Sequence, residues 1–278
     1  MLIVGASGQL GKALQVRYPE AKAVDIDSLD IGNLEAVQAF DWAGVKVILN
    51  AAAYTNVDGA ENPEGRAVAW TANAVAPRNL ATVAAKHEIT LVHISTDYVF
   101  DGTRNPHTED EPFAPLSVYG ASKAAGDIAV STLEKHFILR TSWVIGDGKN
   151  FVKTMLDLAQ KGVSPTVVSD QIGRLTFTST LVEAIDHLLS NLPGYGTYNV
   201  TNDGESASWA EITREIYKIS GLPNTVTDQT TSDYFQNKPE CATRPLQSTL
   251  DLTKITAAGF APKDWKTDLI EYLNKELL

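Results

Sequence analysis

Two side chains four residues apart, Tyr119 and Lys123, are the pair in this sequence best suited to proton transfer. On a helix, residues at this spacing share one face. A free phenol has a pKa of about 10 and is a poor acid at neutral pH, but a neighbouring ammonium stabilises the phenolate and lowers that pKa. The pair could then protonate a carbonyl oxygen while a hydride arrives from a nicotinamide. The alternative interpretation is a solvated helix face, because such pairs are common.

A hydroxyl that could assist this pair lies at Thr96, within the segment Ser95-Thr96-Asp97. The segment closes an apolar run that predicts a strand over 91–95. The carboxyl ends of parallel strands are where an open α/β sheet builds its site, so Thr96 is placed to hydrogen-bond the same carbonyl. A strand-to-loop cap is the structural alternative.

A glycine turn at the start of the chain predicts a dinucleotide site. Gly5, Gly8 and Gly11 follow a short apolar strand and open a helix. Glycine permits a tight turn and a close approach of the backbone to a pyrophosphate, and the helix N-terminus offers N–H groups to phosphate. Asp25, twenty residues after Gly5, is placed to bind a ribose 2′-hydroxyl and to repel a 2′-phosphate, which favours NADH modestly over NADPH. Asp27 and Asp30 lie nearby and leave that register open.

The elements that must hold these residues alternate between strand and helix. Alternation of this kind predicts a Rossmann-type α/β fold, with a doubly wound parallel sheet and a smaller C-terminal α/β lobe. We expect an NAD(P)-binding domain over 1–145 and a substrate-binding lobe over 146–278, with segments that interleave. The expected strands are 2–4, 23–27, 45–50, 91–95, 137–141 and 197–200; the expected helices are 9–17, 34–40, 67–86, 119–135, 151–161, 180–192 and 209–220. Residues 225–243 are polar and show little periodicity.

Composition excludes several classes of protein. The net charge of −11 disfavours non-specific binding to nucleic acid, so no nucleic-acid partner is expected. No apolar run approaches the ~20 residues of a membrane span, and no secretory signal precedes the first strand. The single Cys241 fits a reducing compartment, and we expect a cytoplasmic protein without a membrane partner. The five histidines show no ligand spacing, so no metal is expected, and His93 is interpreted as a packed or tautomer-fixed core residue.

Several ordered segments together resemble the extended short-chain dehydrogenase/reductase family, and within it the dTDP-4-dehydrorhamnose reductases. The likeness covers essentially the whole chain. It is carried by GASGQLG from Gly5, NAAAYTNVD from Asn50, Asn73, STDYVFDG from Ser95, VYGASK from Val118, RTSWVIG from Arg140, Asp170-Gln171 with Gly173, and RPLQSTL from Arg244. So many segments in order are far more specific than any single motif.

The resemblance implies a role for each matching residue. Tyr119 would protonate the C4 oxygen of a keto sugar, Lys123 would bind the nicotinamide ribose and tune Tyr119, and Thr96 would hydrogen-bond the reacting oxygen. Residues implied to bind NADPH or NADH are Gly5, Gly8, Gln9, Leu10, Gly11, Asp25, Asp30, Ile31, Ala52, Ala53, Tyr54, Tyr119 and Lys123. Residues implied to hold the dTDP-sugar are Thr96, Asp97 and Trp143, whose indole offers a flat wall; core packing is the alternative for Trp143.

Two departures from the family pattern concern local structure. Gly173-Arg174-Leu175-Thr176 has leucine where members often have proline, which leaves the local turn in question. Ala13 stands where some members carry a glutamate that helps bind a magnesium ion at a dimer interface, so we expect no such metal site and leave the oligomeric state open.

The function implied is NAD(P)H-dependent reduction of the C4 keto group of dTDP-6-deoxy-L-lyxo-4-hexulose in dTDP-L-rhamnose synthesis. A sugar-nucleotide 4,6-dehydratase or epimerase of the same fold is one alternative, but Tyr98 stands where a dehydratase typically has a glutamate. A non-catalytic NAD(P)-binding regulatory subunit is the other. The first strand is unusually short, which is consistent with a domain fused to, or associated with, an upstream enzyme of the same pathway.

Overall fold

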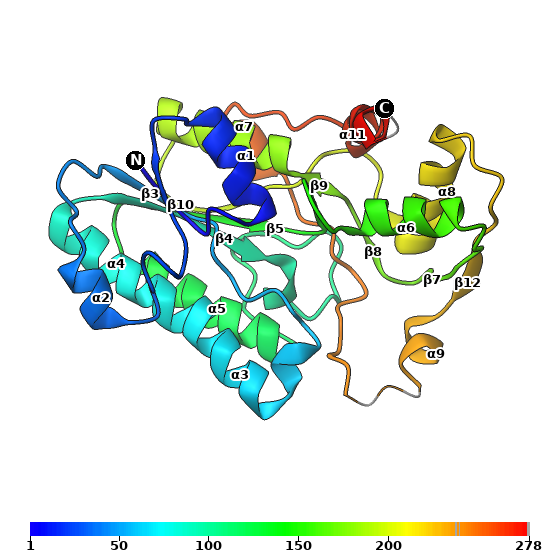
Figure 1. Cartoon of the computed structure of the whole chain (residues 1–278), viewed down its shortest axis with the longest axis horizontal. Helices are drawn as coiled ribbons and strands as arrows, with labels where there is room; N and C mark the ends of the chain where they lie inside the picture. The colour runs from blue at the N-terminus through cyan, green and yellow to red at the C-terminus, as the bar shows by residue number, and fades with distance from the viewer. Residues whose placement is uncertain (237, 239, 277–278) are drawn as a thin grey trace.

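A parallel sheet of six strands forms the centre of the chain (Figure 1). This computed structural model describes residues 1–236, 238 and 240–276. In sheet order the strands are β2 (Lys22–Val24), β1 (Leu2–Val4), β3 (Val47–Asn50), β4 (Thr90–Thr96), β5 (His136–Thr141) and β10 (Gly196–Asn199). All neighbours run parallel, which confirms the predicted Rossmann-type sheet. The chain turns to opposite sides after β1 and β3, and such a switch point builds ligand sites at the carboxyl ends of the strands.

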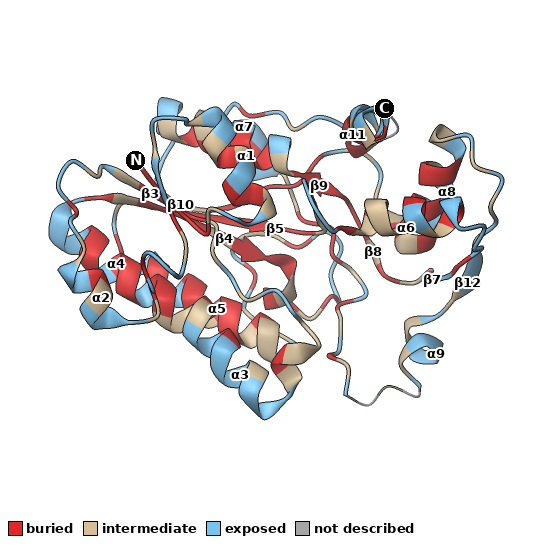
Figure 2. Ribbon diagram, in the orientation of Figure 1, coloured by how far each residue is buried: buried red, intermediate tan, exposed pale blue. Residues whose placement is uncertain are grey.

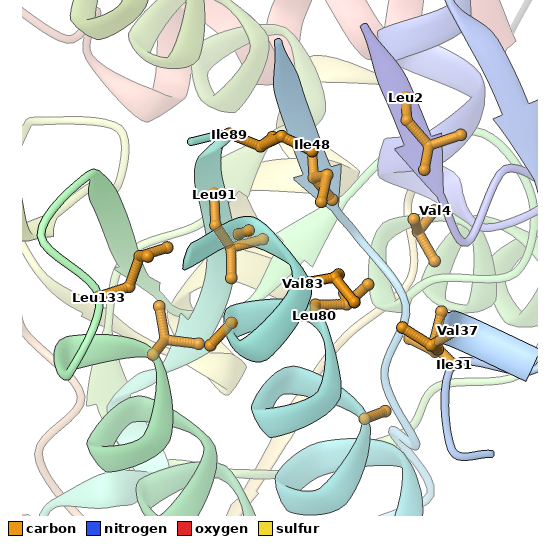
Figure 3. Packing of buried hydrophobic residues seen from close by; sticks show 14 of the residues in the cluster. Leu2, Val4, Ile31, Val37, Ile48, Leu80, Val83, Ile89, Leu91 and Leu133 are labelled. Atoms are coloured by element: carbon orange, nitrogen blue, oxygen red, sulfur yellow. The ribbon is translucent and has the colours of Figure 1, made fainter. Parts of the chain in front are cut away.

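Helices cover both faces of this sheet. The helices α1 (Gln9–Arg17) and α7 (Thr178–Asn191) lie on one face, and α2 (Leu34–Ala39), α4 (Ala76–His87) and α5 (Val118–Ser131) lie on the other (Figure 1). Leu2 and Val4 pack into the cluster under α4, whereas Ile3 packs with α1 and α7. Successive strand side chains point to opposite faces, so a strand buried on both sides is a continuous apolar run. Figure 3 shows the α4 side of this core.

The second half of the chain adds a smaller α/β layer beside the sheet (Figure 1). Its strands are β6 (Val144–Ile145), β7 (Thr166–Val168), β8 (Ile172–Gly173), β9 (Thr176–Phe177), β11 (Ala207–Ser208) and β12 (Thr227–Gln229), paired as β6–β9, β7–β12 and β8–β11. Its helices are α6 (Phe151–Gln160), α8 (Trp209–Ile219), α9 (Thr231–Phe235) and α11 (Trp265–Glu276), whereas α10 (Thr253–Ala257) packs against β10 of the main sheet. Buried residues of α6, α8 and α11 form its core, as the burial colours of Figure 2 show. No helix within the described residues is both long and apolar enough to span a membrane.

Three predicted elements differ from the structure by more than two residues, and the structure adds two elements in a region where none was predicted. The second strand ends at Val24, because Asp25 starts a turn in which its carbonyl accepts the N–H of Ser28 at 2.9 Å. The helix predicted over 67–86 begins earlier, as α3 (Pro63–Trp70), and a π-helical turn η2 (Thr71–Val75) separates α3 from α4. The helix predicted over 119–135 ends at Ser131. The polar region 225–243 contains β12 and α9.

Three elements of the second half belong to the sheet layer, one of which is α10, whose Ile255 packs in the core beside α1 and α7. Strand β10 pairs with β5 in the main sheet, and α7 packs against α1. Residues 178–199 therefore interleave with the first half, whereas a domain boundary between residues 145 and 146 stays a prediction.

Candidate active site

The glycine turn has the shape that a pyrophosphate needs. Gly5 has a φ of +81°, and a Cβ there would lie 2.6 Å from the backbone nitrogen of Ala52. Gly8 caps α1 without any side-chain hydrogen bond, so the first N–H groups of the helix are open to a ligand. Gly11 serves packing, because a Cβ there would lie 2.1 Å from the carbonyl oxygen of Gly5. The three glycines thus close the turn, expose its amides and seat the helix on the strand.

A cavity of about 490 Å³ opens beside this turn, at the switch point of the sheet. Seven of the predicted cofactor residues line it: Gly5, Gly8, Asp25, Asp30, Ile31, Ala52 and Ala53. Ala67, Val68, Thr71 and Ala72, from α3 and η2, close its far wall. An apolar cavity with carboxylates at one side and helix amides at the other fits the adenosine end of a dinucleotide.

Asp25 lies just past the end of β2, at the edge of this cavity. Its Oδ2 accepts the backbone N–H of Ser7 at 2.7 Å, so the carboxylate is tied to the glycine turn. Asp30 is exposed, and its Oδ1 accepts the N–H of Gly32 at 2.9 Å. The sequence left open which of three nearby aspartates lies at the cofactor site. Asp25 and Asp30 both line the cavity, whereas Asp27 does not.

The six other predicted cofactor residues lie outside the cavity lining, and two of them, Tyr119 and Lys123, lie on α5. The side chain of Leu10 is buried with Ile3 in the core, which leaves only its backbone for a pyrophosphate. The Oε1 of Gln9 is buried and has no hydrogen-bond partner within residues 1–236, 238 and 240–276. Gly11 packs on Gly5, and Tyr54 lies beyond Ala53 on the loop that follows β3.

The loop carrying Tyr54 is fixed by a buried asparagine. Asn73, on the π-helical turn, accepts the N–H of Tyr54 at 2.9 Å and donates to the Tyr54 carbonyl at 3.1 Å. Its amide also donates to the Ser122 hydroxyl at 3.0 Å, and Ser122 donates to the Tyr119 carbonyl at 2.7 Å. Asn73 thereby connects the cofactor loop to the catalytic helix, and only the family resemblance marked it in the sequence.

Thr96, Tyr119 and Lys123 are brought together by β4 and α5. Thr96 is the last residue of β4, and Tyr119 lies in the first turn of α5, which Ser117 caps through the N–H of Gly120 at 3.1 Å. Burial raises the pKa of Tyr119, and a hydrogen bond with Thr96 opposes that rise. Tyr119 is therefore a protonated phenol at neutral pH. The prediction that Lys123 lowers the pKa of Tyr119 below its usual value is therefore wrong for this structure, because the effect of burial is larger and the net shift is upward.

Lys123 lies one helical turn after Tyr119 and is 2% exposed. Its Nζ donates to the carbonyl oxygen of Ile94 on β4. Burial lowers the pKa of Lys123 to about 8, although the carboxylate of Asp127 raises it. The ammonium is thus retained at neutral pH, close to its titration point.

Asp97 and Trp143 lie at the ends of neighbouring strands, on the side expected to hold a substrate. Burial raises the pKa of Asp97 to about 6, while hydrogen bonds from Ser248 and Thr96 oppose the shift. Trp143 follows β5 with a φ of +49°, a backbone conformation that costs free energy in a non-glycine residue. Such strain marks positions where the surrounding structure fixes a side chain.

Two residues that the sequence left without a role hold the Trp143 indole. Trp209, at the start of α8, stacks on it with ring centroids 3.7 Å apart. Gly173 lies on another side, where a Cβ would be 3.0 Å from Cζ2 of Trp143. The glycine of the Asp170-Gln171-x-Gly segment therefore leaves room for the indole. Leu175, in place of the usual proline, is fully buried in the core of the second half.

No group of three or more His, Cys, Asp and Glu side chains that could hold a metal ion exists among the described residues. The expectation that this protein uses no metal stays a prediction.

Comparison with known proteins agrees with this arrangement. The RmlD substrate binding domain family matches residues 1–278. The dTDP-4-dehydrorhamnose reductase of Aggregatibacter actinomycetemcomitans is 40% identical, over 97% of this chain and 96% of that protein. The crystal structure of a dTDP-4-dehydrorhamnose reductase from Clostridium acetobutylicum superposes with a TM-score of 0.91 at 36% identity, over 100% and 99% of the two chains. That of the Bacillus anthracis reductase in complex with NADP superposes with a TM-score of 0.89 at 37% identity, over 99% and 97%. The chain therefore belongs to the RmlD substrate binding domain family and is a relative of the dTDP-4-dehydrorhamnose reductases.

Proposed function

We propose that this protein reduces the C4 keto group of dTDP-6-deoxy-L-lyxo-4-hexulose to give dTDP-L-rhamnose, with NADPH or NADH as the reductant. The observation that carries the proposal is the grouping of Thr96, Tyr119 and Lys123 at the carboxyl ends of the strands, beside a glycine turn and cavity that fit a dinucleotide. Ketone reduction needs a hydride donor, a proton donor and a group that fixes the carbonyl oxygen.

Each side chain has a distinct task in this reaction. Tyr119 is half-buried and protonated, so its phenol donates the proton to the C4 oxygen. The Thr96 hydroxyl donates to Oδ1 of Asp97 at 3.0 Å in this structure, and in the reaction it turns to donate to the C4 oxygen and fix its position relative to the phenol. The Lys123 ammonium stabilises the phenolate that forms, because an opposite charge in a buried site favours the ionised form. When bound, the nicotinamide dinucleotide supplies the hydride.

Asp97 and Trp143 are proposed to hold the sugar nucleotide. The Trp143 indole, fixed by Trp209, offers an apolar face to the sugar ring or the base. The Oδ2 of Asp97 is buried and without a partner among the described residues, so it is free to accept a hydrogen bond from a sugar hydroxyl.

Simple reduction is favoured over elimination of water by the side chain at position 98. A 4,6-dehydratase needs an additional acid–base pair, and Tyr98 occupies the place of its glutamate. Tyr98 instead packs edge-on against Tyr119, with ring centroids 5.6 Å apart. Burial raises the pKa of Tyr98, so its phenol stays neutral and cannot replace the glutamate as a base.

The test of the proposed function is oxidation of NADH and NADPH by the purified protein in the presence of dTDP-6-deoxy-L-lyxo-4-hexulose, with the product identified by NMR. We expect dTDP-L-rhamnose to form with at least one of the two cofactors. No oxidation with either cofactor would remove the proposal. Formation of a 4-keto-6-deoxy sugar from dTDP-glucose and NAD would instead identify a dehydratase.

The choice between the two cofactors is expected to depend on Asp25. In the variant Asp25→Ser, the carboxylate that would repel a 2′-phosphate is lost, and the kcat/KM ratio of NADPH over NADH should rise by about tenfold or more, because a like-charge contact costs several kcal/mol. Initial rates with each cofactor measure this ratio. Asp27→Ser is the matched control, because Asp27 is exposed and is not among the residues that line the cavity. An unchanged ratio in Asp25→Ser would contradict the assigned role.

A further inference from the structure

A cluster of buried polar side chains from β4, β5 and α5 lies next to Lys123, and none of these side chains has a role in the proposed reaction. Asp127 on α5 is 1% exposed, Arg140 on β5 is 4% exposed, and His93 on β4 is fully buried. The Nε of Arg140 donates a hydrogen bond to Oδ2 of Asp127 at 3.0 Å. Burying charged groups is costly, so a cluster of this kind calls for a reason beyond packing.

The protonation of His93 follows from its neighbours. The Oδ1 of Asn50 accepts the N–H of Ala52 at 3.3 Å, which leaves the Asn50 amide group to donate to Nδ1 of His93 at 3.0 Å. Nδ1 is then an acceptor, and the ring proton resides on Nε2. Burial and the charge of Lys123 lower the pKa of His93 well below its usual value, so the ring is neutral.

The Nε2–H of His93 faces the carboxylate of Asp127. Nε2 and Oδ1 of Asp127 lie 4.0 Å apart, and both atoms are buried without another hydrogen-bond partner among the described residues. The Arg140 cation, which is bonded to Oδ2 of Asp127, favours the ionised form of this carboxyl, and His93 lies too far from Oδ1 for a hydrogen bond. Burial raises the pKa of Asp127, and the cations of Arg140 and Lys123 oppose that rise.

Asp127 is also one helical turn beyond Lys123, as Lys123 is beyond Tyr119. The Asp127 charge raises the pKa of Lys123 and also that of Tyr119. Both effects favour the forms that ketone reduction needs, an ammonium and a protonated phenol. The polar chain extends through His93 and Asn50 to Ala52, which lines the cofactor cavity.

We propose that Asp127 is a positioning residue of this active site: its buried carboxylate, held by Arg140 and one helical turn from Lys123, keeps the Lys123 amine charged at neutral pH. The inference rests on the proposed reductase function for its catalytic consequence, but not for the ionisation of Lys123.

Several other titratable groups surround α5, and their positions decide whether they can affect the ionisation of Lys123. The titratable groups that face the catalytic pair are Asp127 on α5, His93 on β4, Arg140 on β5, Asp97 and Tyr98 on η3 (Asp97–Val99), and Glu61 on η1 (Gly59–Glu61), which accepts the N–H of Val118. Arg66 on α3 and Arg78 on α4 are exposed to solvent, which screens them. Among these groups, the Asp127 carboxylate raises the pKa of Lys123.

The direct test is an NMR titration of the Lys123 amine in the whole protein labelled with ¹⁵N-lysine, with the resonance assigned by its loss in Lys123→Met. We expect a midpoint near pH 8 in the unmodified protein. In Asp127→Asn the midpoint should fall by about one unit or more, since that is the usual effect of an opposite charge at close range. In Asp127→Glu, which keeps the charge, it should stay close to 8. An unchanged midpoint in Asp127→Asn would overturn the proposal whether or not the protein is a reductase.

The kinetic test is the pH profile of kcat for reduction of the keto sugar. Relative to the unmodified enzyme, Asp127→Asn should be about fivefold slower at pH 8 and less than about twofold slower at pH 6, as a lysine pKa lowered by one unit requires. Equal losses at both pH values would contradict a role through ionisation. If the unmodified protein shows no activity, the proposed function fails, and the NMR titration still decides the role of Asp127.

Two further variants separate ionisation from folding. Asp127→Asn leaves the Arg140 cation buried without its partner, which can unfold the protein. The double variant Asp127→Asn/Arg140→Met removes both charges and should show the same downward shift. Asp268→Asn is the matched control: Asp268 is a buried carboxylate that binds Asn202 at 2.7 Å and Thr180 at 3.0 Å in the second half. The Asp268→Asn protein should have a lower melting temperature than the unmodified protein, and the pH profile of its kcat should be the same.

Discussion

Replacing Tyr119 with phenylalanine is expected to lower kcat for reduction of the keto sugar by on the order of 10²-fold or more, the usual contribution of a general acid. The ring is retained, so its edge-on packing against Tyr98 is preserved and the fold should be unaffected. Only the phenolic proton donor is lost. Steady-state rates measure kcat, and the quenching of protein fluorescence by NADPH or NADH measures cofactor affinity, which we expect to change by less than about threefold.

The control for this variant is Tyr217→Phe. Tyr217 is a buried phenol, and its hydroxyl donates to the carbonyl of Met155 at 3.2 Å in the core of the second half. Loss of that hydrogen bond should cost about 1 kcal/mol of stability and leave kcat nearly unchanged. If Tyr119→Phe retained the rate of the unmodified protein, the catalytic assignment would be wrong, and a non-catalytic NAD(P)-binding protein would become the better interpretation.

Replacing Gly11 with alanine is expected to damage both the fold and cofactor binding. The new Cβ would lie 2.1 Å from the Gly5 carbonyl oxygen and 2.8 Å from that of Ala6, both of which are backbone atoms that cannot rotate away. Helix α1 must therefore move away from the strand. We expect a loss of about 2–3 kcal/mol and a fall in Tm of roughly 5–10 °C. Cofactor affinity should weaken at least about tenfold, because the helix amides leave the pyrophosphate position.

Gly8→Ala separates the two effects. Its Cβ would lie 3.4 Å from the Gly5 carbonyl oxygen, an ordinary contact, and the φ of −69° suits any residue. Tm should therefore stay close to that of the unmodified protein, while cofactor binding weakens because the methyl group lies where the backbone must approach a phosphate. Thermal denaturation followed by circular dichroism and fluorescence titration measure both quantities. A Gly11→Ala protein that melts and binds cofactor normally would contradict the packing role of this glycine.

Much of the sheet layer could be predicted because its signals are local. The buried run Leu2-Ile3-Val4 followed by glycine predicts a parallel strand, and the helix over 9–17 has the predicted bounds. Predictions were weaker where tertiary contacts decide the boundary. The second strand ends before Asp25, because Asp25 forms hydrogen bonds with Ser7 and Ser28 instead of continuing the strand. Ser7 is eighteen residues away in the sequence, so a local sequence pattern could not predict this contact. The helix predicted over 67–86 is interrupted by a π-helical turn that turns Asn73 toward Tyr54 and Ser122.

The sequence by itself determined the chemistry: the glycine turn, the acid after the second strand, and the Tyr119/Lys123 pair at helical spacing are all short-range patterns. Only the tertiary structure decided how that chemistry is held and tuned. The stacking of Trp209 on Trp143, the space that Gly173 leaves for it, and the carboxylate of Asp127 behind Lys123 depend on residues brought together from distant strands and helices. Burial sets the ionisation of Tyr119 and Lys123, and burial is a property of the packed molecule that residue spacing does not encode.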